Sequence, residues 1–366
     1  MVEFIDRSSG DNEKWGGLQK YFGRDDILAF WVADMDFAAP LRVQDALKKE
    51  IAKRAFGYEE IGEEFYEAIV DWYKRRHDTL VEKEWIVPIP SVITGLGVSV
   101  KFWGDDGVLV QPPVYEKFAK ITKLGGAKKV SNSLVKEDGR YRIAYPLPKA
   151  SVALFCSPQN PTGRVWEKEE LEAFAKEAKE KDMVVVSDEI HSDIVYSKTH
   201  HPFINFYDKT VLLSAVNKTF NVAKFGGGYA IIPNKQLREQ FKGFLESLHL
   251  TISPTSAKIL EVAYKEEAWV DELLQVLEQN RDYIDKHLTQ KIKRVAPEGT
   301  YLFWLDFSEF GLSDRELRAK MVNEVKLALN SGLNYGKEGH QYMRLNFATS
   351  LELVKEAVER INRVFG

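Results

Sequence analysis

Short runs of apolar residues, alternating with amphipathic stretches, dominate the middle of the chain. Five such runs lie at 108–113, 151–158, 183–189, 211–216 and 229–233. Their length and their content of valine, leucine and isoleucine predict strands that are buried on both faces of a sheet. Between two of them, residues 166–182 carry apolar side chains at helical spacing, which predicts a helix. This strand–helix–strand alternation indicates an α/β domain with a largely parallel sheet.

The two ends of the chain have a different pattern. Residues 1–40 are irregular, and helices are predicted at 41–56 and 63–77. Long helices, broken near 251–256, are predicted over 236–290. The last part predicts, in order, a strand at 301–307, a helix at 313–330, a strand at 342–348 and a helix at 350–364. This C-terminal part is therefore a smaller α+β unit.

The length of the chain, 366 residues, exceeds what one hydrophobic core usually serves, so two domains are expected. We expect a large domain at residues 41–270. A small domain would combine residues 1–40 with residues 271–366. In this division the N-terminal segment folds back onto the C-terminal unit.

Charge and cysteine content exclude several classes of function. The net charge is −4 and the isoelectric point is about 6.1, so no basic surface for nucleic acid or an anionic membrane is expected. The single cysteine, Cys156, can form neither an intrachain disulfide nor a cysteine-rich zinc site, which favours a reducing, cytoplasmic location. No apolar stretch suits a signal peptide or a membrane-spanning helix. The expected substrate is a small molecule.

Polar residues that suit catalysis follow four of the predicted strands. Tyr115 comes after the first strand, Asn160 after the second, Asp188 and His191 after the third, and Lys218 after the fourth. Ligands bind beyond the carboxyl ends of the strands in an open parallel sheet, so we expect these side chains to meet at one edge. No dinucleotide or P-loop fingerprint explains the set. No metal site is predicted, because the histidine has no partner at metal-ligand spacing.

This set fits a cofactor with a pyridine nitrogen, a phenolate oxygen, an aldehyde and a phosphate, as pyridoxal 5′-phosphate (PLP) has. An acid keeps the pyridine nitrogen protonated, a lysine condenses with the aldehyde, and amide and imidazole groups hydrogen-bond the phenolate. Each residue also has a plainer alternative: Lys218 as a surface lysine, Asp188 as a helix cap and Asn160 as a turn residue. Their joint placement at neighbouring strand ends favours catalysis.

The motifs around these residues resemble the class I/II aminotransferase superfamily of fold-type I PLP enzymes. NPTG stands at 160–163, DEIH at 188–191 and NKTFN at 217–221. The likeness is greater to the MalY/PatB-type carbon–sulfur lyases, often described as cystathionine β-lyases. It extends in order over nearly the whole chain: WVADMDF (31–37), FGY (56–58), WYKRRH (72–77), LVQPPVYEKF (109–118), SPQNPTGRVW (157–166), SDEIHSDIVY (187–196), EGTYLFWLDF (298–307) and MRLNFA (343–348). The resemblance implies a large α/β domain with a mostly parallel mixed sheet and a smaller α+β domain.

The resemblance implies a role for each residue at the strand ends. Lys218 would hold the cofactor as a Schiff base, and Asp188 would pair with the pyridine nitrogen. Asn160 and His191 would hydrogen-bond the phenolate oxygen, and Asn160 would also contact the substrate carboxylate. Tyr115 would stack on the pyridine ring.

The resemblance also implies how the phosphate is bound. The backbone N–H groups of Val92, Ile93 and Thr94 would face it where a helix begins, since helix N-termini favour anions. Asn217, which stands where relatives usually carry serine, would donate to the phosphate as well. Tyr58 would reach the phosphate bound by the neighbouring subunit, which implies a homodimer.

The reaction implied by the resemblance is β-elimination on a sulfur-containing L-amino acid. Arg344 would clamp the α-carboxylate, although it has a plainer alternative as the ion-pair partner of Glu338 or another acid. Lys218 would take the Cα proton and a thiolate would leave from Cβ. L-cystathionine or a related S-substituted cysteine would give a thiol, pyruvate and ammonia. Two alternatives stay open: a PLP-dependent aminotransferase on an L-amino acid, and a regulatory partner-binding protein on the same fold.

Overall fold

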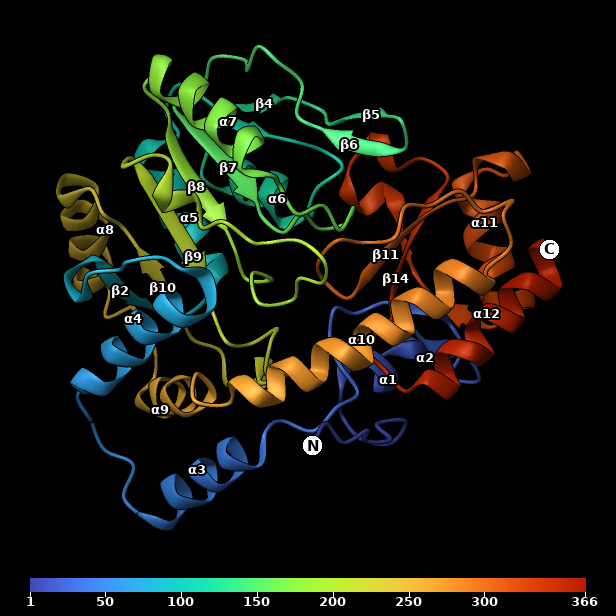
Figure 1. The fold of residues 1–366 in the computed structure, drawn as a ribbon, viewed down its shortest axis with the longest axis horizontal. Helices are drawn as coiled ribbons and strands as arrows, with labels where there is room; N and C mark the ends of the chain where they lie inside the picture. The colour runs from blue at the N-terminus through green and yellow to red at the C-terminus, as the bar shows by residue number, and fades with distance from the viewer.

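A seven-stranded sheet forms the centre of the protein, whose computed structural model describes residues 1–366 (Figure 1). Across the sheet the strands are β2 (Ile86–Ile89), β10 (Gly228–Ile231), β9 (Thr210–Ser214), β8 (Val184–Asp188), β7 (Val152–Cys156), β3 (Val108–Val110) and β4 (Lys129–Ser131). Strand β10 runs opposite to the other six strands, which are parallel to one another. The central strands β7, β8 and β9 are buried along their whole length, as their continuous apolar runs predict.

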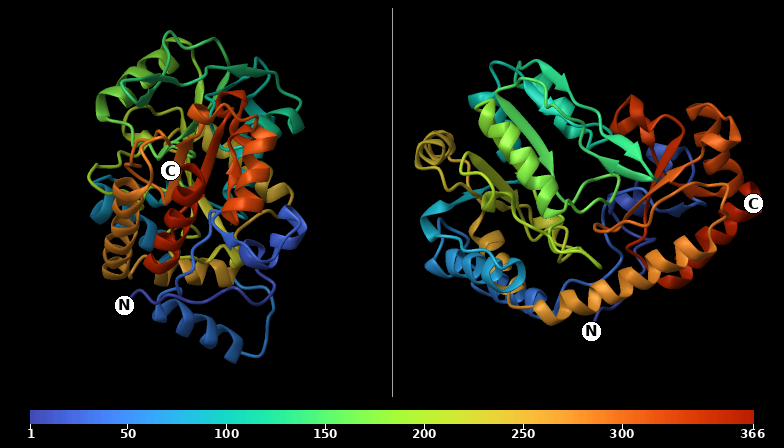
Figure 2. Two further views of the ribbon diagram at one scale, coloured as in Figure 1. Left: turned by 90° about the vertical axis from the view of Figure 1, so that its right-hand side faces the viewer. Right: turned by 45° about the horizontal axis from the view of Figure 1, so that its top comes forward.

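Helices cover both faces of this sheet (Figures 1 and 2). One face packs against α5 (Val92–Trp103), α6 (Lys117–Leu124) and α8 (Lys235–Ser247), and the other against α4 (Glu63–His77) and α7 (Lys168–Glu180). Successive side chains of a strand point to opposite faces. In β7, Leu154 therefore joins the cluster around α5, whereas Phe155 contacts Phe174 of α7 at a ring separation of 4.7 Å. The predicted α/β architecture is confirmed.

A smaller antiparallel sheet lies in the C-terminal part of the chain. Its strands, in sheet order, are β11 (Leu302–Asp306), β14 (Tyr342–Asn346) and β13 (Asn330–Ser331). Helix α12 (Leu351–Phe365) packs against α10 (Glu267–His287). Helix α9 (Pro254–Ala263) lies beside α4. The long α10 runs from the end of α9 to α12, so it extends from the large sheet to the small one (Figures 1 and 2).

The N-terminal segment lies against the C-terminal part, as expected. It contains α1 (Glu13–Gly16), α2 (Leu18–Phe22) and β1 (Leu28–Ala29). Strand β1 pairs in parallel with β12 (Leu327–Ala328). The division of the chain into domains at residues 40 and 270 stays a prediction.

The helix predicted at 313–330 is wrong in its last five residues, 326–330. Helix α11 (Asp314–Lys320) passes into a π-helical turn (Met321–Val325), and Lys326 then adopts a left-handed conformation with φ 62°. The chain continues as β12 and β13. Pairing with distant strands therefore overrides the helical spacing of apolar residues in this stretch.

Other local differences are smaller. The helix predicted at 41–56 is α3 (Leu41–Ala52), and Arg54 beyond it has a φ of 65°. The hairpin of β5 (Val135–Glu137) and β6 (Arg140–Arg142) was not predicted. None of the helices combines the length and the apolar character needed to cross a membrane.

Candidate active site

A cavity of about 660 Å³ opens beyond the carboxyl ends of the central strands, between the large sheet, the small sheet and the N-terminal segment. Its volume suits a cofactor together with a small substrate. Of the residues predicted from the sequence, all except Thr94 and Tyr58 line it: Val92, Ile93, Tyr115, Asn160, Asp188, His191, Asn217, Lys218 and Arg344.

Lys218 lies on the turn that follows β9, and its side chain is half-buried. Its Nζ donates a hydrogen bond to the Ala33 carbonyl at 2.6 Å. Burial lowers the pKa of the amine, and Arg344 lowers it further, against the opposing charges of Asp34 and Asp188. A lowered pKa makes the neutral amine more available, which is the form that attacks an aldehyde or takes a proton.

Asp188, the last residue of β8, is a buried acid that forms no ion pair. Burial raises its pKa from 3.8 to about 7, while a hydrogen bond from the Ile190 backbone N–H at 3.3 Å and the charge of Lys218 act in the opposite direction. A cation placed against this carboxyl would restore its ordinary ionisation. The protonated nitrogen of a pyridine ring is a cation of the required kind.

Arg344, on β14, is a buried guanidinium with no carboxylate partner. Its Nη1 donates to Asn160 Oδ1 at 3.0 Å, its Nη2 donates to the Trp31 carbonyl at 2.8 Å, and its Nε has no partner. Glu338 accepts a hydrogen bond from Ser133 and forms no ion pair with Arg344, so the structural ion-pair alternative fails. A buried cation of this kind needs an anion, and a carboxylate matches its fork.

His191 and Tyr115 supply neutral polar groups to the same cavity. His191 is buried, and burial, reinforced by Lys218 and Arg344, holds its pKa well below the usual value. Its Nδ1 has no hydrogen-bond partner, so it is free for a ligand oxygen. Burial raises the pKa of Tyr115 to about 12, which keeps its phenol protonated.

The start of α5 forms another part of the cavity wall. Ser91 caps this helix, and its Oγ accepts a hydrogen bond from the Thr94 N–H at 3.1 Å. The first N–H groups of a helix have no partner within it, so those of Val92 and Ile93 can bind an anion. Asn217 lies close by; its Nδ2 donates to the Gly227 carbonyl at 3.2 Å and its Oδ1 has no partner.

The N-terminal segment contributes the wall that the sequence did not reveal. Trp31, Val32 and Ala33 line the cavity, and the carbonyls of Trp31 and Ala33 accept from Arg344 and Lys218. Glu13 and Tyr21 also line it. In the sequence, the motif at 31–37 indicated only a likeness to a family. Every residue has a backbone carbonyl, so residue types cannot show which carbonyls accept hydrogen bonds in the cavity.

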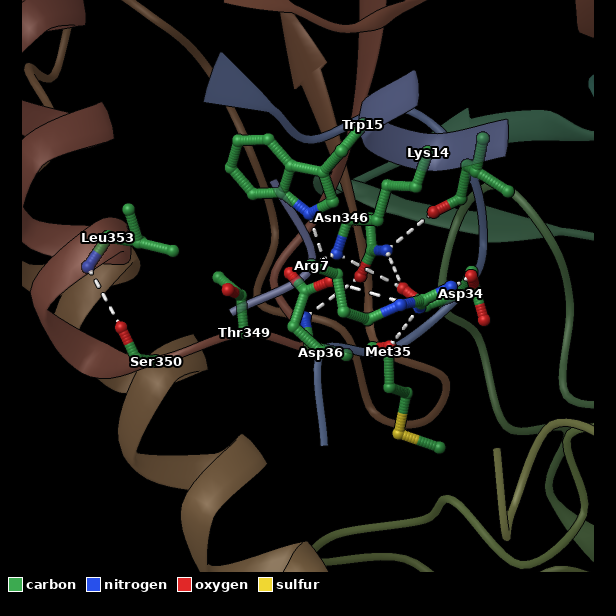
Figure 3. Close-up of polar contacts among 12 residues, drawn as sticks. Arg7, Lys14, Trp15, Asp34, Met35, Asp36, Asn346, Thr349, Ser350 and Leu353 are labelled. Carbon is green, nitrogen blue, oxygen red and sulfur yellow. Dashed lines mark hydrogen bonds and ion pairs between the residues drawn. The ribbon is translucent and has the colours of Figure 1, made fainter. Parts of the chain in front are cut away.

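Charged side chains hold this segment in place (Figure 3). Lys14 donates to Asp36 at 2.6 Å, and both side chains are fully buried. Arg7 donates to Asp34 at 2.7 Å in a partly exposed pair. Asn346 Nδ2 donates to the carbonyls of Val32 and Asp34 at 2.5 and 2.7 Å, which ties the segment to β14.

The sequence model of the aminotransferase class I and II family matches residues 25–361. The chain belongs to this family. It is 36% identical to the cystathionine beta-lyase PatB of Bacillus subtilis, over 97% of both proteins. The family that the motifs indicated is confirmed.

Two solved structures share the fold over almost their whole length. Cystalysin from Treponema denticola, which contains PLP, has a TM-score of 0.91 and 29% identity and covers 100% of this chain and 98% of its own. The PLP-bound C–S lyase from Staphylococcus hominis has a TM-score of 0.90 and 28% identity, with coverage of 100% and 97%. These likenesses confirm the predicted fold class.

Proposed function

We propose that this family member is a PLP-dependent carbon–sulfur β-lyase. It cleaves L-cystathionine or a related S-substituted cysteine to a thiol, pyruvate and ammonia. The observation that carries the proposal is the likeness to the cystathionine beta-lyase PatB over almost the entire chain. The structural likeness to a PLP-bound C–S lyase also supports it.

The cofactor is pyridoxal 5′-phosphate, and the groups in the cavity fit it. When bound, PLP supplies an electron sink for the negative charge that remains when Cα loses its proton. Lys218 would hold the aldehyde carbon through its Nζ. Asp188 would hold the pyridine nitrogen, since burial leaves this acid in need of a cation. Asn160 and His191 would hold the phenolate oxygen, and Tyr115 would cover one face of the ring.

The phosphate would bind at the start of α5. The N–H groups of Val92 and Ile93 are available there, and Asn217 lies at the same end of the cavity. Thr94 was predicted to contribute as well, but its N–H is already bonded to Ser91. We therefore assign the phosphate to two backbone groups and one side chain of this chain.

Two residues of the chain would act on the substrate itself. Arg344 would bind the α-carboxylate, with Asn160 fixing the plane of the guanidinium through the bond at 3.0 Å. Lys218 would take the Cα proton on Nζ, which the lowered pKa of this amine permits. The C–S bond then breaks, the thiolate leaves with the bonding electrons, and water converts the three-carbon remainder to pyruvate and ammonia.

A homodimer is part of the proposal. The side chains of Phe56 and Tyr58 are exposed in the single chain, on a stretch at 53–62 that has no regular structure. Large aromatic side chains left in water favour burial against another surface. Tyr58 would reach the cofactor phosphate of the neighbouring subunit. The cytoplasmic location stays a prediction from the sequence.

The two alternatives are less well supported. An aminotransferase would use the same lysine, aspartate and arginine, so the cavity by itself favours neither reaction. A purely regulatory protein would not need Lys218, Asp188 and Arg344 brought together in one cavity. Thiol release separates the possibilities: the lyase forms one thiol per pyruvate from L-cystathionine, measured with a thiol reagent. An aminotransferase would release none.

A further inference from the structure

Lys218 lies on a turn, beyond the end of regular structure. The ladder of β9 ends at Ser214, and residues 216–221 form turns closed by a bond from the Phe220 N–H to the Val216 carbonyl. A reactive amine must be held within about 0.5 Å of its working position. Side-chain contacts must therefore fix this segment, because no neighbouring strand does so.

The residue after the lysine is anchored by a buried carboxylate. Thr219 is fully buried, and its Oγ1 donates to Asp193 Oδ2 at 2.9 Å. Asp193 lies on the loop after β8, the loop that also carries the cavity residues Ile190 and His191. One hydrogen bond thus joins the turn that carries Lys218 to the loop that carries two other cavity residues.

The same carboxylate also binds the helix behind the loop. Its Oδ1 accepts from Trp72 Nε1 at 2.9 Å and lies 3.0 Å from His77 Nε2, both on α4. Burial by itself raises the pKa of Asp193, but the bonds from His77, Thr219 and Trp72 outweigh it and hold the pKa below its usual value. An ionised acceptor makes shorter and stronger hydrogen bonds than a neutral one.

We propose that Asp193 is a positioning residue that, through Thr219, fixes the place of Lys218 in the cavity. Asp193 does not line the cavity and belongs to no part of the machinery described above. The inference rests on Lys218 as the residue that holds the cofactor. It does not depend on whether elimination or transamination follows.

Thr219→Val tests the contact with least disturbance, because valine keeps the branched shape and removes only the hydroxyl donor. Thr219→Ser keeps the donor and removes a methyl group. Thr210→Val is the matched control: Thr210 is equally buried at the far end of β9, and its hydroxyl donates to the Tyr207 carbonyl at 2.7 Å. Asp193→Asn weakens the acceptor from the other side.

Two readouts are needed. The first is the rate at which each cofactor-free protein captures PLP on Lys218, followed by the visible absorbance of the bound cofactor. The second is kcat and KM of the loaded enzyme. We expect Thr219→Val to slow PLP capture and to lower kcat roughly tenfold, with KM changed less than about twofold, because a displaced amine loses reactivity without losing carboxylate binding.

Thr219→Ser should stay within about threefold of the wild-type protein in both readouts, and Thr210→Val should leave both unchanged. Asp193→Asn combined with Thr219→Val should slow capture little more than Asp193→Asn alone, because that change already weakens the shared contact with Thr219. Equal behaviour of Thr219→Val and Thr210→Val would overturn the inference. If the wild-type protein releases no thiol but Thr219→Val still slows PLP capture, the proposed reaction fails and the positioning role stands.

Discussion

At the residue scale, the charged side chains of the cavity lack the partners that burial demands. Asp188 has no cation and Arg344 has no anion, although each is at most 5% exposed. Such groups destabilise a folded chain unless a ligand completes them. In the proposed site, PLP and an amino-acid substrate would supply the two missing charges. Asp188 could be found in the sequence because apolar runs mark where strands end, and polar residues just beyond them face one edge. Arg344 lies within a strand and was indicated only by the family resemblance of the motif at 343–348.

Replacing Arg344 tests the assignment of the carboxylate site. Arg344→Ala should raise KM by a factor equivalent to about 2–4 kcal/mol, because it removes one partner of a buried charge pair. Arg344→Lys should recover only part of this loss, since lysine cannot form two parallel bonds to a carboxylate. Steady-state kinetics measure both. Unchanged KM in Arg344→Ala would place the substrate carboxylate elsewhere.

The raised pKa of Asp188 predicts a pH dependence of stability. Between its ordinary pKa of 3.8 and about 7, the folded cofactor-free protein holds a proton that the unfolded chain has lost. The protonated side chain of Asp188 therefore favours the folded state. Its contribution to the free energy of unfolding is greatest below about pH 4 and is lost as the pH rises towards 7. Asp188→Asn should remove it, so the variant should lose less stability than wild type between about pH 4 and pH 7.

Urea unfolding of both cofactor-free proteins at the two pH values measures the difference. The comparison cancels the titration of groups that do not interact with position 188. Equal losses of stability in the wild-type and variant proteins would contradict the assignment of a buried, uncompensated acid at this position.

At the element scale, the N-terminal segment is the part of the site that sequence reasoning missed. Its contribution consists of two backbone carbonyls, at Trp31 and Ala33, which residue types do not reveal. The helix predicted at 313–330 failed for a related reason. Strand β12 forms because it pairs with β1, about 300 residues away in the chain. The spacing of apolar residues within 313–330 cannot indicate a pairing with so distant a segment.

Breaking the buried pair that holds this segment should be costly. Lys14→Met removes the nearest cation from the buried Asp36 carboxylate and leaves only Arg7 Nη1, at 3.9 Å, so we expect a loss of about 3–5 kcal/mol in the free energy of unfolding. Lys326→Met is the control, since the pair of Lys326 with Asp26 joins the same segment to the C-terminal part but is exposed to solvent, so its loss should have a much smaller effect. Denaturant unfolding measures the free energy of unfolding of both variants. Equal losses of this free energy in the two variants would show that burial of the Lys14–Asp36 pair has no special effect.

At the scale of the whole molecule, the sequence predicted an α/β unit followed by a smaller α+β unit, but not the order of the strands. A fully buried strand has the same apolar composition whether it runs parallel or antiparallel. The reversed direction of β10 therefore had no signature. The sheet order matters for function because it places β7, β8 and β9 side by side, with their carboxyl ends at one cavity.

The proposed dimer can be tested by mixing two inactive variants. Lys218→Ala lacks the lysine, and Tyr58→Ala lacks the residue assigned to the neighbouring site. If Tyr58 acts across the interface, a mixed dimer has one complete site. Refolding the two variants together should therefore restore about a quarter of wild-type activity. No recovery, with mixed dimers isolated through different affinity tags on the two variants, would place Tyr58 outside the neighbouring site.

The central claim, carbon–sulfur β-elimination, is tested most directly by pyruvate release from L-cystathionine by the PLP-loaded protein with no 2-oxo acid added. A lyase regenerates its resting state in each cycle, so pyruvate should accumulate steadily over many turnovers. An aminotransferase without an acceptor stops after one half-reaction. A single burst with no further product, leaving the cofactor as pyridoxamine phosphate, would contradict the proposed function.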